Sequence, residues 1–528
     1  MTFKFQINDE IRFRHDRQLL DKAEAFRPKM HPVVRKPVRA VELTKNESLL
    51  EGWGMAEIHA DMEKMAFSKG QSIILDFGRH CTGRFSMDIR SVGSPMDAPL
   101  YLRLRFAEVP AELAHESEEY DGWLSRSWIQ EEFIHLDVLP VRLELPRRYA
   151  FRYVELTVID TSPKWAAVFT NPEVLCASSA PGNAETDPVP EDPELARIYE
   201  VGLHTLQECK TDVFEDGPKR DRRLWLGDLR LQALASYASE DNPDLVKRCL
   251  YLFAGMTSEE GEISANVFTQ PSPQPDDTFL FDYSLFFASV LHDFLQQHPD
   301  EMVLEDLYPV AKKQMDLALQ QVDEEGRLHL QKDRPVFVDW SQEFAKDTAG
   351  QAIMIYTLKH FIELTRMKRE DTAPYVKQLE KLENDARSRL YDPEKKLFRA
   401  GEEGTEYNIA SQVWMVLAGV FGQMKNREIM TETIQQLFPV KGIATPYMYH
   451  HVTEALFQAG LKQEAVGLMK AYWGKMIELG ADTYWEAFDP DQPDYSPYGS
   501  PIISSYCHAW SCTPVYLIHK YLLADQSA

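Results

Sequence analysis

Short runs in the first third of the chain alternate between apolar and polar residues. Between residues 71 and 159 such runs occur at 71–78, 85–90, 100–106, 133–139 and 153–159. A period of two places alternate side chains on opposite faces of a sheet, and Gly78 closes the first run as a turn residue would. Residues 1–185 are therefore predicted to form a domain with the antiparallel β-sandwich fold.

From Asp192 onward the apolar residues follow the spacing of amphipathic helices, after a Ser-, Pro-, Gly- and Asn-rich linker at 178–190. Successive helical hairpins predict an all-α (α/α)6 barrel over residues 186–528, although an open solenoid would give the same count of helices. No sequence repeat supports the solenoid. The twelve predicted helices are 193–213, 225–240, 244–257, 279–298, 302–323, 343–368, 371–390, 407–422, 426–437, 446–460, 462–479 and 504–523.

The longer connections follow the first, third, fifth and eleventh of these helices, at 211–224, 258–278, 324–342 and 480–503. If successive helices alternate in direction, all four connections open at the same end of the ring. Loops on a rigid scaffold are common places for binding and catalytic groups. The residues predicted to surround one mouth are Asp216, Asp221, Asp277, Asp339, Trp340, Trp485 and Glu486.

Tryptophan stands beside carboxylates on three of these connections. Trp225 follows the charged stretch 212–223, and the pairs Asp339-Trp340 and Trp485-Glu486 lie further along. A core tryptophan next to a solvated acid is common, so one pair alone carries little weight. Three pairs at one mouth favour a sugar site, because an aromatic ring stacks on a sugar face and carboxylates bind its hydroxyls. Two carboxyl groups also supply the acid and the base of glycoside hydrolysis.

The net charge of −26 argues against nucleic acid and anionic membranes as partners. The first ten residues have no apolar signal core, and no run is long enough to span a bilayer, so a cytoplasmic protein is expected. The six cysteines include no CxxC pair and are expected to be free thiols. A metal at Cys507, His508 and Cys512 is a minor alternative, because buried cysteine is a common core residue.

Other chemistries lack their sequence motifs. The chain has no GxGxxG after a strand, no phosphate-binding GxxxxGK[ST], no GxSxG and no HExxH. No EF-hand loop is found, and no metal or other cofactor is expected. His508 is a candidate for a ligand hydrogen bond at the mouth, although a lone histidine is more often a core residue, and His450-His451 are interpreted as structural.

Three motifs together resemble one family. Residues 216–228 (DGPKRDRRLWLGD), 482–486 (DTYWE) and 505–510 (SYCHAW) resemble signatures of the α-L-rhamnosidases of glycoside hydrolase family 78, as do Asp339-Trp340 and residues 75–78. The resemblance covers most of the chain in order. It implies an (α/α)6 barrel preceded by β-sandwich modules, and an inverting hydrolase of terminal α-L-rhamnosyl residues. Larger members carry a further C-terminal β-sandwich with no counterpart here, which favours small rhamnosides and oligosaccharides as substrates.

The resemblance also implies residue roles, with Asp221 as general acid and Glu486 as general base about 6.5–9.5 Å apart. Many members have a glutamate as acid in an Asp-Cys-Pro-x-Arg-Asp-Glu run. This loop is one residue shorter and offers Asp221, with Asp216 as the alternative proton donor. The substrate-binding residues implied are Asp216, Arg220, Trp225, Asp228, Asp339, Trp340, Trp485 and His508.

Other functions remain open from the sequence. Another six-hairpin glycosidase, such as a uronyl hydrolase or a trehalase-like enzyme, would share the barrel. A non-catalytic carbohydrate-binding protein would bind sugar without turnover, although binding alone needs no donor and base. A helical scaffold for protein partners would expose a large apolar patch. The expected partner is a small-molecule glycoside, and a homodimer is compatible with the sequence.

Overall fold

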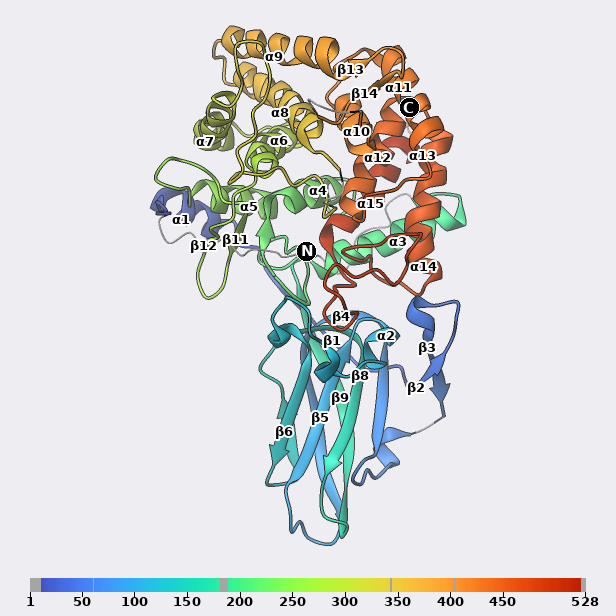
Figure 1. Cartoon of the computed structure of the whole chain (residues 1–528). Helices are drawn as coiled ribbons and strands as arrows, with labels where there is room; N and C mark the ends of the chain where they lie inside the picture. Colours follow the sequence, from blue (N-terminus) through green and yellow to red (C-terminus); the bar gives the residue numbers. More distant parts are fainter. Residues whose placement is uncertain (1–10, 60, 181–188, 342–343, 402–404, 524–528) are drawn as a thin grey trace.

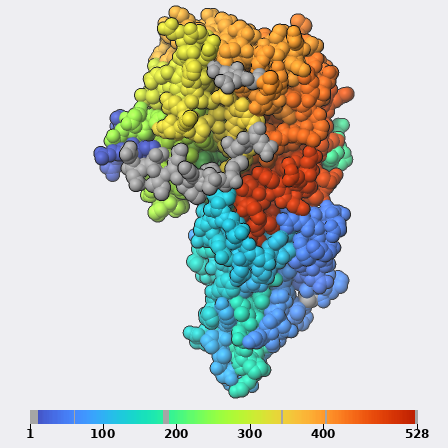
Figure 2. All heavy atoms as spheres, viewed as in Figure 1, coloured from blue at the N-terminus to red at the C-terminus, as the bar shows by residue number. Residues whose placement is uncertain are grey.

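The computed structural model describes residues 11–59, 61–180, 189–341, 344–401 and 405–523. Figure 1 shows a sheet domain joined end-on to a larger helical domain. In Figure 2 the red C-terminal part of the chain lies directly against the blue sheet domain. The predicted order of a β domain followed by a helical ring is confirmed.

The sheet domain contains one nine-stranded antiparallel sheet within the described residues, with the central order β1-β9-β4-β8-β5-β6. Strand β2 pairs with β3 and β4, and β7 pairs with β4. Alternate apolar side chains of the long strands meet in a separate buried core, which includes Phe85, Leu102 and Phe151. The strands are β1 (His31–Arg35), β2 (Arg39–Lys45), β3 (Trp53–Ile58), β4 (Ser72–Gly93), β5 (Leu100–Ala107), β6 (Glu131–Leu136), β7 (Val141–Glu144), β8 (Tyr149–Asp160) and β9 (Trp165–Ser178).

Gly78 is not the end of a strand. The two runs predicted at 71–78 and 85–90 belong to the single strand β4, whose register against β8 shifts between Asp76 and Cys81. Gly78 adopts a φ of 81° at this irregularity, a conformation that glycine adopts without steric cost. A glycine in a bulge and a glycine in a turn look the same in the sequence, which is why the prediction split the strand.

Each of the twelve predicted segments contains a helix, and alternate helices form an inner ring. Along the ring, α4 packs on α6, α6 on α8, α8 on α10, and α10 on α12, while α15 returns to α4. No helix in the described ranges is both long and apolar enough to cross a membrane. The inner helices are α4 (Leu226–Tyr237), α6 (Phe281–Gln297), α8 (Asp347–Met367), α10 (Ile409–Leu417), α12 (Pro446–Gln458) and α15 (Pro514–Ile518). The helices that alternate with them are α3 (Pro193–Glu208), α5 (Pro243–Ala254), α7 (Glu301–Leu319), α9 (Ala373–Asp385), α11 (Gln423–Leu437) and α13 (Lys462–Met469).

A helix that the sequence analysis did not predict, α1 (Arg17–Ala25), precedes the sheet. Asp16 caps it by accepting hydrogen bonds from the backbone of Gln18 and Leu19. The helix packs on α5 of the helical domain, and Arg248 donates a hydrogen bond of 2.8 Å to the carbonyl of Ala23. The helix lies within residues 1–185, which were predicted as a β domain, and nine residues give too short a pattern to identify it.

Buried polar contacts join the two domains beside the mouth of the barrel. The Nζ atom of Lys219 donates to Glu112 at 2.5 Å and to the carbonyl of Ser504 at 2.7 Å. Glu112 lies on α2 (Pro110–Leu113) in the sheet domain, and burial raises its pKa to about 7. Glu108 accepts a 2.7 Å hydrogen bond from the backbone of Tyr506. The sheet domain is thus bonded to the loops that carry the predicted site.

Two glycines within helices allow the packing of the inner ring of helices to be tested. A Cβ atom at Gly227 on α4 would lie 2.4 Å from ring atoms of Tyr283, whereas a Cβ atom at Gly467 on α13 would meet no atom within 4 Å. Gly227→Ala is expected to destabilise the protein by about 1–3 kcal/mol through overpacking. Gly467→Ala is expected to stabilise it by up to about 1 kcal/mol through helix propensity. Thermal midpoints of both variants at one scan rate provide the measurement, and equal shifts would contradict the packing of α4 on α6.

Candidate active site

The predicted mouth lies where the inner helices begin. Trp225 is the N-cap residue of α4, and Asp228 lies in the first turn of this helix. The short strand β10 (Leu224–Trp225) pairs with β11 (Asn266–Phe268), which fixes the start of α4 against the next connection. The connections at 211–224 and 480–503 also meet here, since Arg220 Nε donates to the Ile503 carbonyl at 3.1 Å.

Hydrogen bonds between Asp216 and Arg223 close the loop between α3 and α4. The backbone amide of Asp216 donates to the carbonyl of Arg223, and the amide of Arg223 donates to Asp216 Oδ1, both at 2.9 Å. At the tip, Asp221 and Arg222 have φ values of 61° and 56°, in the left-handed region that non-glycine residues rarely adopt. The side chain of Asp221 remains 25% exposed, so the loop presents this carboxyl group to solvent.

Arg222 holds this strained tip in place. Its Nε atom donates to the carbonyl of Pro218 at 2.8 Å, and its Nη2 atom donates to the carbonyl of Arg148 at 2.8 Å. The Arg222 guanidinium also lies 5.8 Å from the ring centroid of Trp128. Arg148 and Trp128 belong to the sheet domain, so this domain supports the loop conformation that presents Asp221.

Glu486 is a buried carboxylate with a partner on each oxygen. Its Oε2 atom forms an ion pair with Arg220, and its Oε1 atom accepts a 2.5 Å hydrogen bond from the Tyr498 hydroxyl. Trp510 Nε1 donates to the Glu486 carbonyl at 2.9 Å, which fixes the backbone. Burial raises the pKa of Glu486, while Arg220 and Tyr498 act in the opposite direction and favour its ionised form.

Arg220 connects the two predicted catalytic residues. One end of its guanidinium pairs with Glu486, and its Nη1 atom lies 3.7 Å from Asp221 Oδ1. The same group lies 3.9 Å from the ring centroid of Tyr498 and donates to the carbonyl of Ile503 at 3.1 Å. The carboxyl groups of Asp221 and Glu486 are therefore separated by one guanidinium group. Their predicted separation of about 6.5–9.5 Å stays a prediction.

Asp216, Asp228 and His508 form a buried group deeper in the mouth. His508 Nε2 lies 4.0 Å from Asp216 Oδ2, and His508 Nδ1 lies 3.7 Å from Asp228 Oδ1. Burial raises the pKa of both carboxyl groups well above the ordinary value, with further contributions from neighbouring carboxylates. Burial, followed by the charge of Arg220, lowers the pKa of His508 well below its usual value, so this imidazole is neutral.

Two polar atoms of this group lack a hydrogen bond. Asp228 Oδ1 and His508 Nδ1 are fully buried and have no hydrogen-bond partner among the described residues. Leaving buried polar atoms unsatisfied costs free energy, and such atoms in a native structure require an explanation. Their position beside Glu486 and Arg220 indicates a site for a ligand with hydroxyl groups.

Both side-chain oxygens of Asp339 accept hydrogen bonds from other residues of the protein. Its two oxygens accept hydrogen bonds from the backbone of Ser341 at 2.8 Å, from Ala444 at 3.2 Å, and from both the amide (3.2 Å) and the hydroxyl (2.5 Å) of Thr445. These bonds fix the loop before α8 to the start of α12. The adjacent Trp340 packs edge-on against Tyr498 at 6.2 Å, which places its ring at the mouth. Asp339 therefore positions this loop, and direct sugar contact by Asp339 stays a prediction.

The two remaining predicted tryptophans differ in their surroundings. Trp225 is half-buried and meets Tyr283 edge-on at 6.2 Å. Trp485 is 2% exposed and packs edge-on against Phe488 at 5.5 Å and Tyr506 at 5.4 Å. Trp485 thus anchors the backbone next to Glu486 inside the core, and its place in the sugar-binding wall stays a prediction.

Tyr498 was not predicted to be a site residue, and the support given by Trp510 and Lys219 was not predicted either. Tyr498 lies in the connection 480–503, which was predicted to be at the mouth, but no acidic residue beside it drew attention to it. Trp510 was seen as part of the SYCHAW motif, and its hydrogen bond to the Glu486 carbonyl depends on a long-range contact. Lys219 was read as one charge in a charged loop, although it is buried against Glu112.

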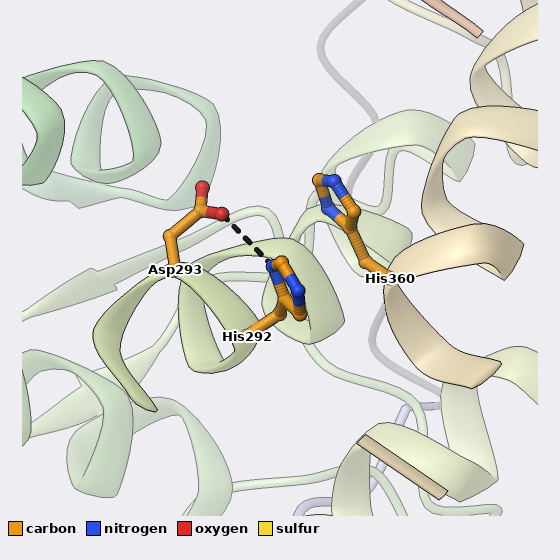
Figure 3. A group of neighbouring side chains, drawn as sticks. All are labelled: His292, Asp293 and His360. Carbon is orange, nitrogen blue, oxygen red and sulfur yellow. Dashed lines mark hydrogen bonds and ion pairs between the residues drawn. The ribbon is translucent and has the colours of Figure 1, made fainter. Parts of the chain in front are cut away.

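One group of metal-type ligands occurs in the part of the chain that the structure describes, and it lies away from this mouth. His292 and Asp293 on α6 and His360 on α8 bring three candidate ligand atoms within 4.8 Å of one another (Figure 3). The two imidazole rings stack at 4.3 Å with an angle of 9° between them. A metal bound by both rings would have to lie near both ring planes, and stacked parallel rings do not allow this. The residues do not fit a metal in this arrangement.

Family models match both parts of the chain. Residues 37–176 match the model described as the glycosyl hydrolase family 78 alpha-rhamnosidase N-terminal domain. Residues 189–522 match the bacterial alpha-L-rhamnosidase 6 hairpin glycosidase domain. A comparison with curated protein sequences gave no match.

Solved structures agree with the family models. A rhamnosidase from Klebsiella oxytoca with rhamnose bound is 44% identical, with a TM-score of 0.93 over 96% of this chain and 99% of that one. The family 78 rhamnosidase of Bacillus sp. GL1 is 19% identical, with a TM-score of 0.71 over 86% of this chain and 46% of that one. The α-L-rhamnosidase of Streptomyces avermitilis complexed with L-rhamnose, 16% identical with a TM-score of 0.65, covers 94% of this chain and 44% of that one. The last two show likeness of fold only. On the family models and the Klebsiella oxytoca structure, the chain belongs to the α-L-rhamnosidases of glycoside hydrolase family 78.

Proposed function

We propose that this α-L-rhamnosidase releases terminal α-L-rhamnose from small rhamnosides and oligosaccharides by an inverting single displacement. The observation that supports it best is the pair of buried, unsatisfied atoms Asp228 Oδ1 and His508 Nδ1 beside the Arg220–Glu486 ion pair. The hydroxyl groups of a sugar would bond Asp228 Oδ1 and His508 Nδ1. Its anomeric carbon would lie near the Arg220–Glu486 ion pair.

In the proposed mechanism, Asp221 donates its proton to the glycosidic oxygen as the bond from this oxygen to C1 breaks. Glu486 takes a proton from a water molecule, and the water oxygen bonds to C1 from the opposite face of the ring. The product is β-L-rhamnose, with the former aglycone released as an alcohol. Arg220 and Tyr498 keep Glu486 ionised and oriented before the water attacks.

Asp216 and Asp228 have a different role in this proposal. Their raised pKa values shift these carboxyl groups toward the protonated form, and a protonated carboxyl group can both donate and accept a hydrogen bond. The neutral imidazole of His508 adds one donor and one acceptor. This group therefore suits neighbouring sugar hydroxyls, each of which is also a donor and an acceptor.

Proton NMR of early turnover with 4-nitrophenyl α-L-rhamnoside tests the reaction. The β anomer of rhamnose should appear first and mutarotate later. First appearance of the α anomer would overturn the single displacement. Release from a different glycoside alone would favour another six-hairpin glycosidase, and binding without release would favour a carbohydrate-binding protein. The cytoplasmic location and the homodimer expected from the sequence stay predictions.

The proton donor can be identified from two isosteric variants. Asp221→Asn should lower kcat by at least about 10²-fold for an alkyl or sugar leaving group, and much less for 2,4-dinitrophenolate, which needs no protonation. Asp216→Asn should lower kcat/KM by a similar factor for both leaving groups, since it changes sugar binding. The reverse pattern in the two variants would assign proton donation to Asp216.

Glu486→Gln should be nearly inactive on every rhamnoside, including one with a good leaving group, because the variant loses the carboxylate that takes the proton from water in this mechanism. Added azide should restore turnover with a good leaving group and give β-L-rhamnosyl azide, since azide needs no general base. Product analysis by NMR provides the measurement. Retained hydrolysis in Glu486→Gln would remove this residue from the role of base.

Tyr498→Phe should shift the acidic limb of the kcat/KM profile to higher pH by about one unit. Burial raises the pKa of Glu486, and the Tyr498 hydroxyl opposes this by donating to the carboxylate. A hydrogen bond to a charged group contributes about 1.5–3 kcal/mol, and one pKa unit corresponds to about 1.4 kcal/mol. Loss of the bond makes the base protonated up to a higher pH.

Tyr308→Phe is the matched control for this variant. The Tyr308 hydroxyl also lies at hydrogen-bond distance from a glutamate, Glu370 at 3.1 Å, but on α7, outside the inner ring. Its pH profile should equal that of the unmodified protein. An unchanged acidic limb in Tyr498→Phe would show that the hydroxyl does not control the charge of Glu486.

A further inference from the structure

We propose that Trp123 of the sheet domain forms a platform for the ring of the aglycone, next to the rhamnose site. The ligand class is a ring with an apolar face, either an aryl group or a pyranose. This inference rests on the proposed function and extends it to the leaving group. It assigns part of the substrate specificity to the domain that does not carry the catalytic carboxylates.

The segment that carries Trp123 is fixed against the catalytic domain. Tyr120 is buried in one cluster with Tyr498, Ile502 and Ile503, and its hydroxyl accepts a hydrogen bond of 3.1 Å from the backbone of Leu124. At Gly122 a Cβ atom would lie 2.6 Å from the carbonyl oxygen of Tyr498, so the two backbones approach closely here. Trp123 therefore has a defined position at the domain boundary.

Trp123 packs against Tyr498, whose hydroxyl bonds the proposed base, Glu486. Its ring centroid lies 5.6 Å from that of Tyr498, with an angle of 48° between the planes. Tyr498 donates to Glu486 at 2.5 Å and carries the Arg220 guanidinium 3.9 Å from its ring centroid. Trp340 from the barrel also packs on Tyr498, at 6.2 Å. Three aromatic rings from three segments thus lie together beside the catalytic pair.

Exposure distinguishes Trp123 within this group. Tyr498 is 3% exposed, whereas Trp123 is 37% exposed and is the only exposed tryptophan among the described residues. A large aromatic side chain held rigidly at the surface, next to a catalytic pair, is typical of a ring-binding platform. The exposed part of Trp123 thus offers an accessible aromatic surface next to Tyr498.

The direction in which the aglycone must leave the buried sugar site agrees with the position of Trp123. Asp216, Asp228 and His508 are buried and suit the sugar hydroxyls, whereas Asp221, the proposed donor to the leaving oxygen, is 25% exposed. The leaving group must therefore extend from the buried group past Asp221 toward solvent. Arg220 contacts both Asp221 and Tyr498, so the ring of the leaving group passes close to the aromatic group that contains Trp123.

The test compares Trp123→Ala with three substrates: α-L-rhamnosyl fluoride, 4-nitrophenyl α-L-rhamnoside and a rhamnosyl-glucose disaccharide. The fluoride has no ring in its leaving group, so its kcat/KM should stay within twofold of the unmodified protein. For a substrate whose ring stacks on Trp123, kcat/KM should fall about tenfold, the size expected for losing one aromatic contact. Trp123→Phe should recover most of this loss.

Phe133→Ala is the matched control, because Phe133 is a 49% exposed aromatic residue of the same domain on strand β6. It should leave all three substrates unaffected. A loss confined to the aryl rhamnoside or to the disaccharide would support the platform and identify the ring it binds. An equal loss on the fluoride, or no loss on either ring substrate, would overturn it. Failure of the unmodified protein to hydrolyse the fluoride would instead contradict the proposed function.

Discussion

The buried guanidinium of Arg220 is the group on which the proposed site depends. It pairs with Glu486, approaches Asp221, stacks on Tyr498 and bonds the carbonyl of Ile503. A buried carboxylate would otherwise protonate, since burial alone disfavours its charge. Removing one partner of a buried ion pair costs about 3–5 kcal/mol, so the two charges stabilise each other in place. In the proposed mechanism, the charge of the base therefore depends on Arg220, which also lies next to the proposed acid.

The sheet domain contacts the loops that carry the proposed site. Lys219, in the loop that carries Arg220, donates a hydrogen bond to Glu112 of the sheet domain. Arg222 of the same loop donates a hydrogen bond to the carbonyl of Arg148. Tyr506, two residues before His508, donates its backbone amide to Glu108. Without these contacts, the barrel alone would have to provide hydrogen-bond partners for the buried Lys219 and stabilise the strained loop. The domain boundary therefore supports the loops of the proposed site, and is not only a link between two folds.

The sequence predicted the fold and the residues of the mouth better than their roles. Helical periodicity and the alternation of connections located Asp216, Asp221, Trp340 and Glu486 at one end of the ring, because these signals are local and repeat along the chain. The hydrogen bonds of Asp339 to Thr445, and of Tyr498 to Glu486, join segments that no local pattern relates. Gly78 shows the same limit on a smaller scale, since only strand pairing separates a bulge from a turn.

The residue after Asp221 gives a physical reason for an aspartate as the proposed acid. In the run that many family members share, a glutamate follows the aspartate, and here that next residue is Arg222. Its guanidinium donates to the carbonyls of Pro218, Lys219 and Arg148, so this side chain serves the loop and cannot supply a proton as a carboxylic acid does. Asp221, the residue before Arg222, has a left-handed backbone and a side chain that is 25% exposed. A shorter acid side chain is thus combined with an unusual backbone conformation, and the bonds of Arg222 to both domains maintain that conformation.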